Sequence, residues 1–97
     1  MIRGITGSGF EFNIPDGMDK DFRFIKAYKK IKSGDEDQAL EGAIDLVSAV
    51  FANEEEEERF YKHLASQHEG RVPSDILYQE LNEIVELAAK KDESVKN

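Results

Sequence analysis

The sequence predicts a mainly α-helical domain in which a short N-terminal β-hairpin packs on a bundle of about four helices. Apolar residues alternate with polar ones only near the N-terminus, over residues 10–14, whereas from residue 19 onward they recur every three or four positions. Glycine, proline and helix-capping residues divide this second part into four segments. Two strands are marginally stable alone, so we expect the hairpin to rest on the helices.

The hairpin is predicted by the alternation of Phe10, Phe12 and Ile14 with polar residues, which places three large apolar side chains on one face of a strand. Ile2 and Ile5 precede it and belong to the other strand. The intervening segment 7–9, Gly-Ser-Gly, is faintly similar to a phosphate-binding loop, but no Gly-Lys-Ser/Thr follows and no helix begins there. We interpret it as the hairpin turn.

Two helices are predicted between residues 19 and 51. The first begins near Asp19, a good N-cap, runs to about Lys32 and ends before Gly34. Its apolar side consists of Phe22, Phe24, Ile25, Tyr28 and Ile31. The second begins after Asp35 or Asp37, and its spacing is the cleanest in the chain, which predicts the central core helix. Its apolar residues are Leu40, Ala43, Ile44, Val47, Val50 and Phe51.

Two further helices are predicted in the remaining sequence. Asn53, with Glu56 three residues later, has the pattern of a capping box for helix three. The packing face of this helix consists of Phe60, Tyr61 and Leu64. Gly70 ends helix three, and Ser74 is the expected cap of helix four. The buried stripe of helix four consists of Ile76, Leu77, Leu81, Ile84, Val85 and Ala88.

Length and composition indicate one small domain, which we expect to span residues 1–90 with a flexible polar tail over residues 91–97. The 97 residues include no cysteine, which excludes disulfides and favours a reducing, cytoplasmic setting. No apolar run reaches the roughly 20 residues of a membrane span. The N-terminus lacks the apolar stretch of a signal peptide, so we expect neither membrane insertion nor export.

Charge is distributed unevenly along the chain, whose net charge is −8. Residues 20–33 contain six basic residues and one acidic residue, whereas residues 35–69 contain eleven acidic and two basic ones. The acidic excess argues against general nucleic-acid binding. A basic stripe on the first helix could contact an anionic surface, but we favour solvation or pairing with the acidic segment of the same or a neighbouring molecule. The stripe consists of Lys20, Arg23, Lys26 and Lys30.

Patterns of catalytic or metal-binding residues are absent from the sequence. His63 and His68 are five residues apart, so on a helix they point in different directions and cannot share a metal. The run at residues 54–58 lacks the alternating ligands and central glycine of a calcium loop, and we interpret it as a solvated helix start, with contact to a basic partner as the alternative. No pattern indicates a nucleophile beside a base, so we predict no enzyme activity, cofactor or metal.

Several segments follow one another in a recognisable order between residues 9 and 88. They are Phe10–Ile14, Asp21–Ile25, a helix ending in Val50-Phe51, Phe60–Leu64, and Glu69-Gly70-Arg71-Val72-Pro73. In this order, and above all in the Glu-Gly-Arg-Val junction between two helices, the chain resembles the small tail assembly chaperones of long-tailed phages and prophages. It departs from them at residues 51–53, where such sequences often carry a glycine.

The resemblance implies a non-enzymatic protein of the host cell cytoplasm that binds the tape-measure protein, the tail-tube protein or both during tail assembly, several copies to a client. It assigns no site residues. Aromatic residues are frequent interface anchors, and from the residues alone we predict partner binding or homo-oligomerisation through aromatic and acidic side chains. The candidates are Phe22, Tyr28, Phe60, Tyr61, Glu54, Glu55 and Glu58.

Two other functions stay open at this stage. One is a small acidic regulator that presents residues 35–37 and 54–58 to a basic, nucleic-acid-binding protein. The other is a structural component retained in a finished particle. The resemblance also implies that ribosomal slippage at Lys90 and Lys91 could produce a longer form, and the alternative is that these lysines complement the negative end of helix four.

Overall fold

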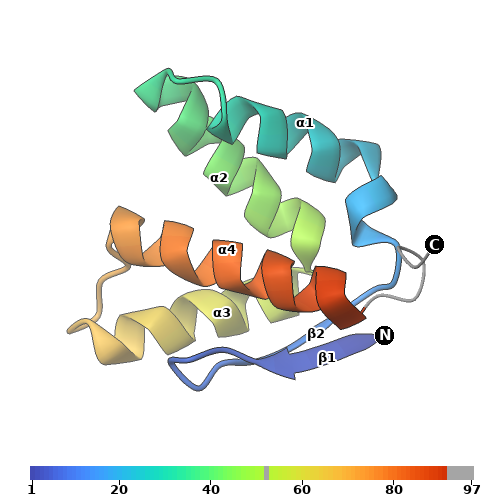
Figure 1. The fold of residues 1–97 in the computed structure, drawn as a ribbon. Coiled ribbons are helices and arrows are strands. Elements are labelled where there is room, and N and C mark those ends of the chain that lie inside the picture. The colour runs from blue at the N-terminus through green and yellow to red at the C-terminus, as the bar shows by residue number, and fades with distance from the viewer. Residues whose placement is uncertain (52, 92–97) are drawn as a thin grey trace.

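The computed structural model describes residues 1–51 and 53–91. In this part of the chain an antiparallel strand pair is followed by four α-helices (Figure 1). The elements are β1 (Ile2–Ile5), β2 (Glu11–Ile14), a 3₁₀ turn (Met18–Lys20), α1 (Phe22–Ile31), α2 (Glu36–Val50), α3 (Glu54–Gln67) and α4 (Ser74–Lys91). The predicted fold class, mainly α with a short N-terminal hairpin, is confirmed.

The hairpin directs the predicted apolar face into the core. Strands β1 and β2 pair with Ile2 opposite Ile14, and the side chains of Phe10, Phe12 and Ile14 are buried as predicted. The turn between the strands is also confirmed, and its Gly9 has a φ of 93°, a left-handed conformation that glycine tolerates.

The first helix begins later than predicted. Its N-cap is Asp21, whose carboxylate accepts a hydrogen bond of 2.9 Å from the backbone N–H of Arg23, and Asp19 lies in the preceding 3₁₀ turn. This turn places the side chain of Met18 in the core. The long-range burial of Met18 therefore displaced the helix start that local capping chemistry predicted at Asp19.

The other helix starts follow the predictions except at α4. Asp35 and Asn53 cap α2 and α3, and each side chain accepts a backbone hydrogen bond from the first turn of its helix. Ser74 is the first residue of α4 rather than its cap. The N–H of Leu77 bonds to the carbonyl oxygen of Pro73 at 3.0 Å, so Pro73 occupies the cap position.

The core lies between the hairpin and the helices, with an aromatic cluster at its centre. The ring of Phe10 lies 6.1 Å from that of Phe51 and 5.2 Å from that of Phe60, so the hairpin, the end of α2 and α3 meet at one point. Around the cluster, Val47, Leu64, Leu81 and Ile84 are buried. The burial of Val47 and Leu81 agrees with the predicted stripes of α2 and α4.

Near its start and its middle, α2 departs in part from its predicted burial. Leu40 and Ile44 are 48% and 56% exposed, whereas Leu46, outside the predicted stripe, is 3% exposed. In Figure 1 the start of α2 lies beside α1, and the connection between the two helices projects away from α3 and the hairpin. Phe22, predicted on the apolar side of its helix, is likewise 70% exposed at the start of α1.

Two long cationic side chains reach the backbone of the hairpin. The ammonium of Lys91, in the last turn of α4, donates a hydrogen bond of 2.8 Å to the carbonyl oxygen of Arg3. Arg59 of α3 donates one to the carbonyl oxygen of Glu11. The helix thus continues one residue past the predicted domain limit, and residues 92–97 of the predicted tail lie outside the described residues.

Candidate functional site

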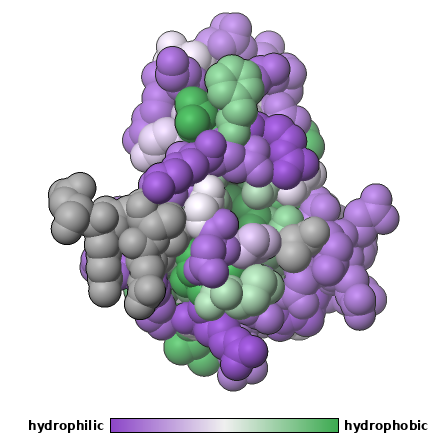
Figure 2. Space-filling model, turned by 90° about the vertical axis from the view of Figure 1, so that its right-hand side faces the viewer, coloured by the Kyte–Doolittle hydropathy of each residue, from purple (hydrophilic) through white to green (hydrophobic). Residues whose placement is uncertain are grey.

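An apolar groove of about 300 Å³ separates α1 from α4. Tyrosine, aliphatic and a few polar side chains line it: Tyr28, Ile31 and Lys32 from α1, Leu46 from α2, and Tyr78, Leu81, Asn82 and Val85 from α4. We call this the α1–α4 groove. Its apolar lining contrasts with the exterior, which is largely hydrophilic with small apolar patches on the face in Figure 2.

Neighbours on α1 hold Tyr28 at the rim of the groove. Its ring stacks on Phe24 with 5.8 Å between centroids and 9° between ring planes. The ammonium of Lys32 lies 5.2 Å from the centroid of the same ring, a cation–π distance. Because these contacts restrict its rotamers in advance, Tyr28 would lose little conformational entropy on meeting a partner.

The α4 wall of the groove was not predicted as a site. Leu81 is buried, whereas Tyr78 and Val85 are half-buried and remain accessible from the groove. A sequence signal for this wall does exist, because Tyr78 precedes Leu81 by three residues and Val85 by seven, the spacing of one helix face. That α1 lies across from this face could not be inferred from spacing.

The predicted aromatic candidates occupy four different environments. Tyr28 lies in the α1–α4 groove and Phe22 is exposed elsewhere on α1. Phe60 is 0% exposed, because its whole ring packs in the core. It is therefore not accessible to a partner. Tyr61 is half-buried on α3, where burial, followed by the nearby charges of residues 57 and 58, raises the pKa of its hydroxyl. The structure therefore does not bring these four side chains together.

The predicted acidic candidates gather at the start of α3. Glu54, Glu55 and Glu58 are exposed, and within the described part of the chain none of them forms an ion pair. Glu56 and Glu57 differ, because Glu56 pairs with an arginine at 2.9 Å and Glu57 accepts a hydrogen bond of 3.0 Å from a serine hydroxyl. The three exposed carboxylates form an acidic surface separate from the groove lining.

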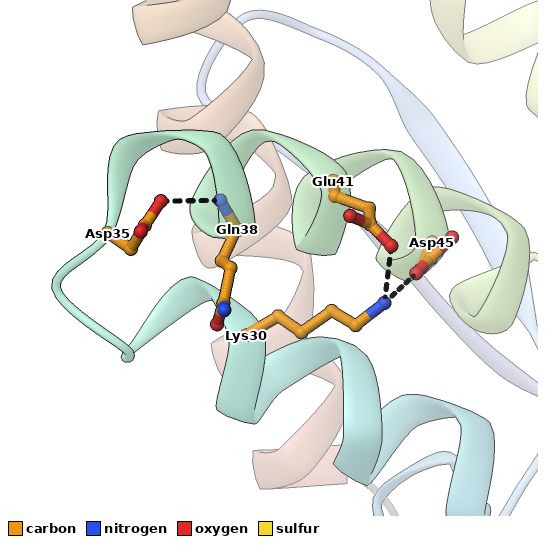
Figure 3. A network of polar contacts seen from close by, with 5 residues as sticks. All are labelled: Lys30, Asp35, Gln38, Glu41 and Asp45. Carbon is orange, nitrogen blue, oxygen red and sulfur yellow. Dashed lines mark hydrogen bonds and ion pairs between the residues drawn. The ribbon is translucent and has the colours of Figure 1, made fainter.

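The basic stripe of α1 is partly neutralised within the molecule. The ammonium of Lys30 lies 2.8 Å from Glu41 and 3.1 Å from Asp45 of α2 (Figure 3), and these hydrogen bonds, Glu41 first, raise the pKa of Lys30. Arg23 pairs with Asp21 at 2.9 Å, and this hydrogen bond lowers the pKa of the Asp21 carboxyl. Pairing of the stripe with the acidic segment of the same molecule is therefore confirmed for Lys30.

Sequence reasoning missed a polar cluster at the tip of the hairpin. The hydroxyl of Ser8 lies 3.0 Å from Nε2 of His63 on α3 and donates a hydrogen bond of 2.8 Å to Glu80 on α4. Thr6 Oγ1 lies 3.1 Å from the same hydroxyl, and Gln67 donates to the Ser8 carbonyl oxygen at 2.9 Å. No local pattern pairs residues 55 and 72 positions apart, so only the fold assembles this cluster.

The cluster places a serine beside a histidine, contrary to the expectation from sequence. The hydroxyl proton of Ser8, however, is donated to Glu80 and not to His63, so the histidine does not activate the serine as a nucleophile. A hydroxyl has one proton, and Ser8 gives it to Glu80, so Nε2 of His63 must donate to the hydroxyl. A general base would instead accept that proton. This arrangement favours a structural clasp that ties the turn to α3 and α4.

Comparisons with family models, curated proteins and solved structures give no match for this chain. Within residues 1–51 and 53–91, no helix is long and apolar enough to cross a membrane. The same residues contain no group of three or more histidine or carboxylate side chains placed to hold a metal ion.

Proposed function

We propose that this protein is a non-enzymatic tail assembly chaperone that holds a helical segment of the tape-measure or tail-tube protein during phage tail assembly in the host cell cytoplasm. The observation that carries the proposal is the α1–α4 groove, an apolar recess in a molecule with a largely hydrophilic exterior. The sequence resemblance to tail assembly chaperones supplies the class of client.

The shape and chemistry of the groove suit an amphipathic helix. Such a helix binds by inserting apolar side chains at positions i, i+3 or i+4, and i+7 between two walls, and α1 and α4 provide walls here. Tyr28 and Tyr78, one on each wall, combine a large apolar ring with a hydroxyl, a combination favoured at interfaces. A tape-measure protein is long and helical, so covering its apolar stripes would prevent premature self-association.

A binding experiment tests this proposal directly. Synthetic peptides that cover the amphipathic segments of the tape-measure protein encoded near this gene are titrated with the chain, and fluorescence anisotropy gives the dissociation constant. Tyr28→Ala combined with Tyr78→Ala should raise it by about tenfold or more, because each anchor contributes over 1 kcal/mol at such sites. Phe22→Ala, an exposed aromatic outside the groove lining, serves as the matched control and should bind as the parent does.

Two results would contradict the proposal. One is the absence of binding by any tape-measure or tail-tube segment, and the other is unchanged affinity in the double tyrosine variant. Gene order is an independent test, because the proposal expects a long helical open reading frame downstream and a tail-tube gene upstream.

The exposed carboxylates at the start of α3 support a second candidate, an acidic regulator of a basic, nucleic-acid-binding protein. Glu54, Glu55 and Glu58 face solvent and are free of ion pairs among the described residues. Ionic strength separates the two candidates. A carboxylate surface should lose its partner steeply between low and moderate salt, whereas an apolar helix in the groove should not.

A further inference from the structure

The two walls of the α1–α4 groove carry charges of opposite sign along their outer edges. On the α1 side Lys32 lines the groove, and Lys29 precedes it by three residues, so the two side chains lie on the same side of the helix. Both are exposed, and among residues 1–51 and 53–91 neither forms an ion pair. Helix α1 contains no acidic residue. We call Lys29 and Lys32 the basic rim of the groove.

The rim on α4 is acidic. Asn82 lines the groove and is exposed. Asp75 precedes Asn82 by seven residues and Glu86 follows it by four, so the three side chains lie along one side of α4. Asp75 and Glu86 are exposed, and neither forms an ion pair with another described residue. Residues 74–89 contain no lysine or arginine. We call Asp75 and Glu86 the acidic rim.

Apolar side chains form the surface between the two rims. Leu46 and Leu81 are buried, Ile31 and Val85 are half-buried, and all four line the groove. In the described part of the chain no ion pair joins one rim to the other. The charges of both rims are therefore available to an occupant of the groove, which would meet lysines on one side and carboxylates on the other.

A helix that lies in such a groove presents its two flanks to different walls. Its apolar stripe points into the groove, and the residues on either side of the stripe reach the two rims. Turning the helix end for end exchanges the flanks. A helix with one sign of charge on both flanks would therefore place one flank against a rim of like charge in either direction, which electrostatic repulsion opposes.

We propose that the α1–α4 groove selects a client helix with acidic residues along one flank of its apolar stripe and basic residues along the other, and that this pattern sets the direction of the bound helix. The inference rests on the proposed function, because it names the charge pattern of the segment that the groove would hold. Client carboxylates would face Lys29 and Lys32, and client lysines or arginines would face Asp75 and Glu86.

Designed peptides of identical composition test the charge pattern. Two segregated peptides carry acidic residues on one flank and basic residues on the other, in the two possible arrangements, whereas a mixed peptide carries both signs on each flank. Fluorescence anisotropy titrations with the full chain give the dissociation constants. Exposed ion pairs are individually weak, but several act together here, so the segregated peptides should bind about tenfold more tightly than the mixed one. Circular dichroism must show equal helicity in all three.

The direction of the bound helix is measured with a spin label at the N-terminus of each segregated peptide. Tyr78 and Val85 are about 10 Å apart along α4 and mark the two ends of its lining. The label of one peptide should broaden the amide signals of the chain most strongly beyond the Tyr78 end. The label of the other should do so beyond the Val85 end, because exchanging the flanks reverses the favoured direction.

A charge-reversed variant tests the basic rim itself. Lys29→Glu with Lys32→Glu makes both rims acidic, so this variant should lose its preference for the segregated peptides. It should also bind a peptide with basic residues on both flanks about tenfold more tightly than the parent does. Lys26→Glu with Lys62→Glu is the matched control, because it changes the net charge equally at exposed positions outside the groove lining. This control should keep the preference of the parent.

Three outcomes would overturn the inference. They are equal affinity of the segregated and mixed peptides, one common direction for both segregated peptides, and an unchanged preference in the variant with a reversed basic rim. Tyr28→Ala with Tyr78→Ala separates such a failure from failure of the proposed function. Equal affinities that fall in this variant would remove the charge pattern and leave a helix-binding groove, whereas no binding by any peptide would contradict both.

Discussion

The two halves of α2 have similar helical periodicity but different surroundings. In the C-terminal half Leu46, Val47 and Val50 are buried in the core, whereas Leu40 in the N-terminal half and Ile44 near the middle of the helix are about half exposed. The contrast teaches that periodicity identifies which face of a helix is apolar but does not reveal whether another element covers it. Substitutions that affect one half and spare the other make the contrast measurable.

The largest difference is expected from the same substitution at a buried and at an exposed position of α2. Val47→Asp should unfold the domain, because Val47 is fully buried. The free-energy cost of burying an unpaired carboxylate there exceeds the roughly 5 to 10 kcal/mol by which a domain this small is stable. Ile44→Asp should change the free energy of unfolding by only about 0.5 kcal/mol, since Ile44 is more than half exposed. Thermal unfolding of dilute protein, followed by circular dichroism, compares the two. A cooperative transition in Val47→Asp would contradict the packing of α2.

The next effect concerns the contact that holds the exposed half to α1. In a helix, alanine is ordinarily better than glycine by about 1 kcal/mol. In Gly42→Ala, however, the new Cβ would lie 2.8 Å from both the Ala27 carbonyl oxygen and the Lys30 Cβ. We expect a net loss of about 1 to 3 kcal/mol in urea unfolding. Gln38→Ala on the exposed surface of the same helix is the control and should be neutral or slightly stabilising, and equal behaviour of the two variants would refute the close contact.

A smaller loss of stability is expected from a substitution in the hairpin turn, which packs on α3 and α4. Ser8→Ala removes the hydroxyl that bonds to both His63 and Glu80. The buried carboxylate of Glu80 then loses the hydrogen bond that it accepts from Ser8. The expected loss is about 1 to 2 kcal/mol, the usual range for a buried polar group that loses its partner. Ser66→Ala, which removes an exposed hydroxyl bonded to a helix carbonyl, is the control. A cost at Ser8 no larger than at Ser66 would mean that the cluster does not clasp the turn.

The smallest effect is expected from the ion pairs across the exposed half. Lys30→Met should lower stability slightly, while Lys29→Met, which removes a lysine without an ion pair among the described residues, should not. Hydrogen bonds to Glu41 and then Asp45 raise the pKa of Lys30 above its ordinary value of 10.5. The contribution is therefore fully present below pH 10.5 and lost as pH rises through the raised pKa. A difference between the parent and Lys30→Met that persists well above this range would not come from the ion pairs.

Local chemistry in the sequence determined where most elements begin and which face of each is apolar. The alternation of Phe10, Phe12 and Ile14 and the caps at Asp35 and Asn53 act within a few residues, so the isolated sequence contains the needed information. The first helix shows the limit. Aspartate is a suitable cap at position 19 and at position 21, and in the structure Asp21 caps α1 while Asp19 lies in a 3₁₀ turn whose Met18 packs into the core.

The candidate site was accessible to sequence reasoning only in part. Of the aromatic residues predicted to bind a partner, Tyr28 lies in the α1–α4 groove, while Phe60 lies in the core. Tyr78 completes the groove from fifty positions beyond Tyr28 in the chain, and the hydroxyl of Ser8 bonds to Glu80 across 72 positions. Such contacts depend on how whole helices pack, which no local spacing specifies.

Only the tertiary structure decided which apolar side chains of α2 stay exposed. The sequence established that α2 has an apolar stripe, that α1 is basic and that residues 35–69 are acidic. Whether Leu40 and Ile44 would be covered depended on where α3 and α4 pack, because an apolar side chain leaves water only where another element approaches it. The α1–α4 groove is left open for the same physical reason.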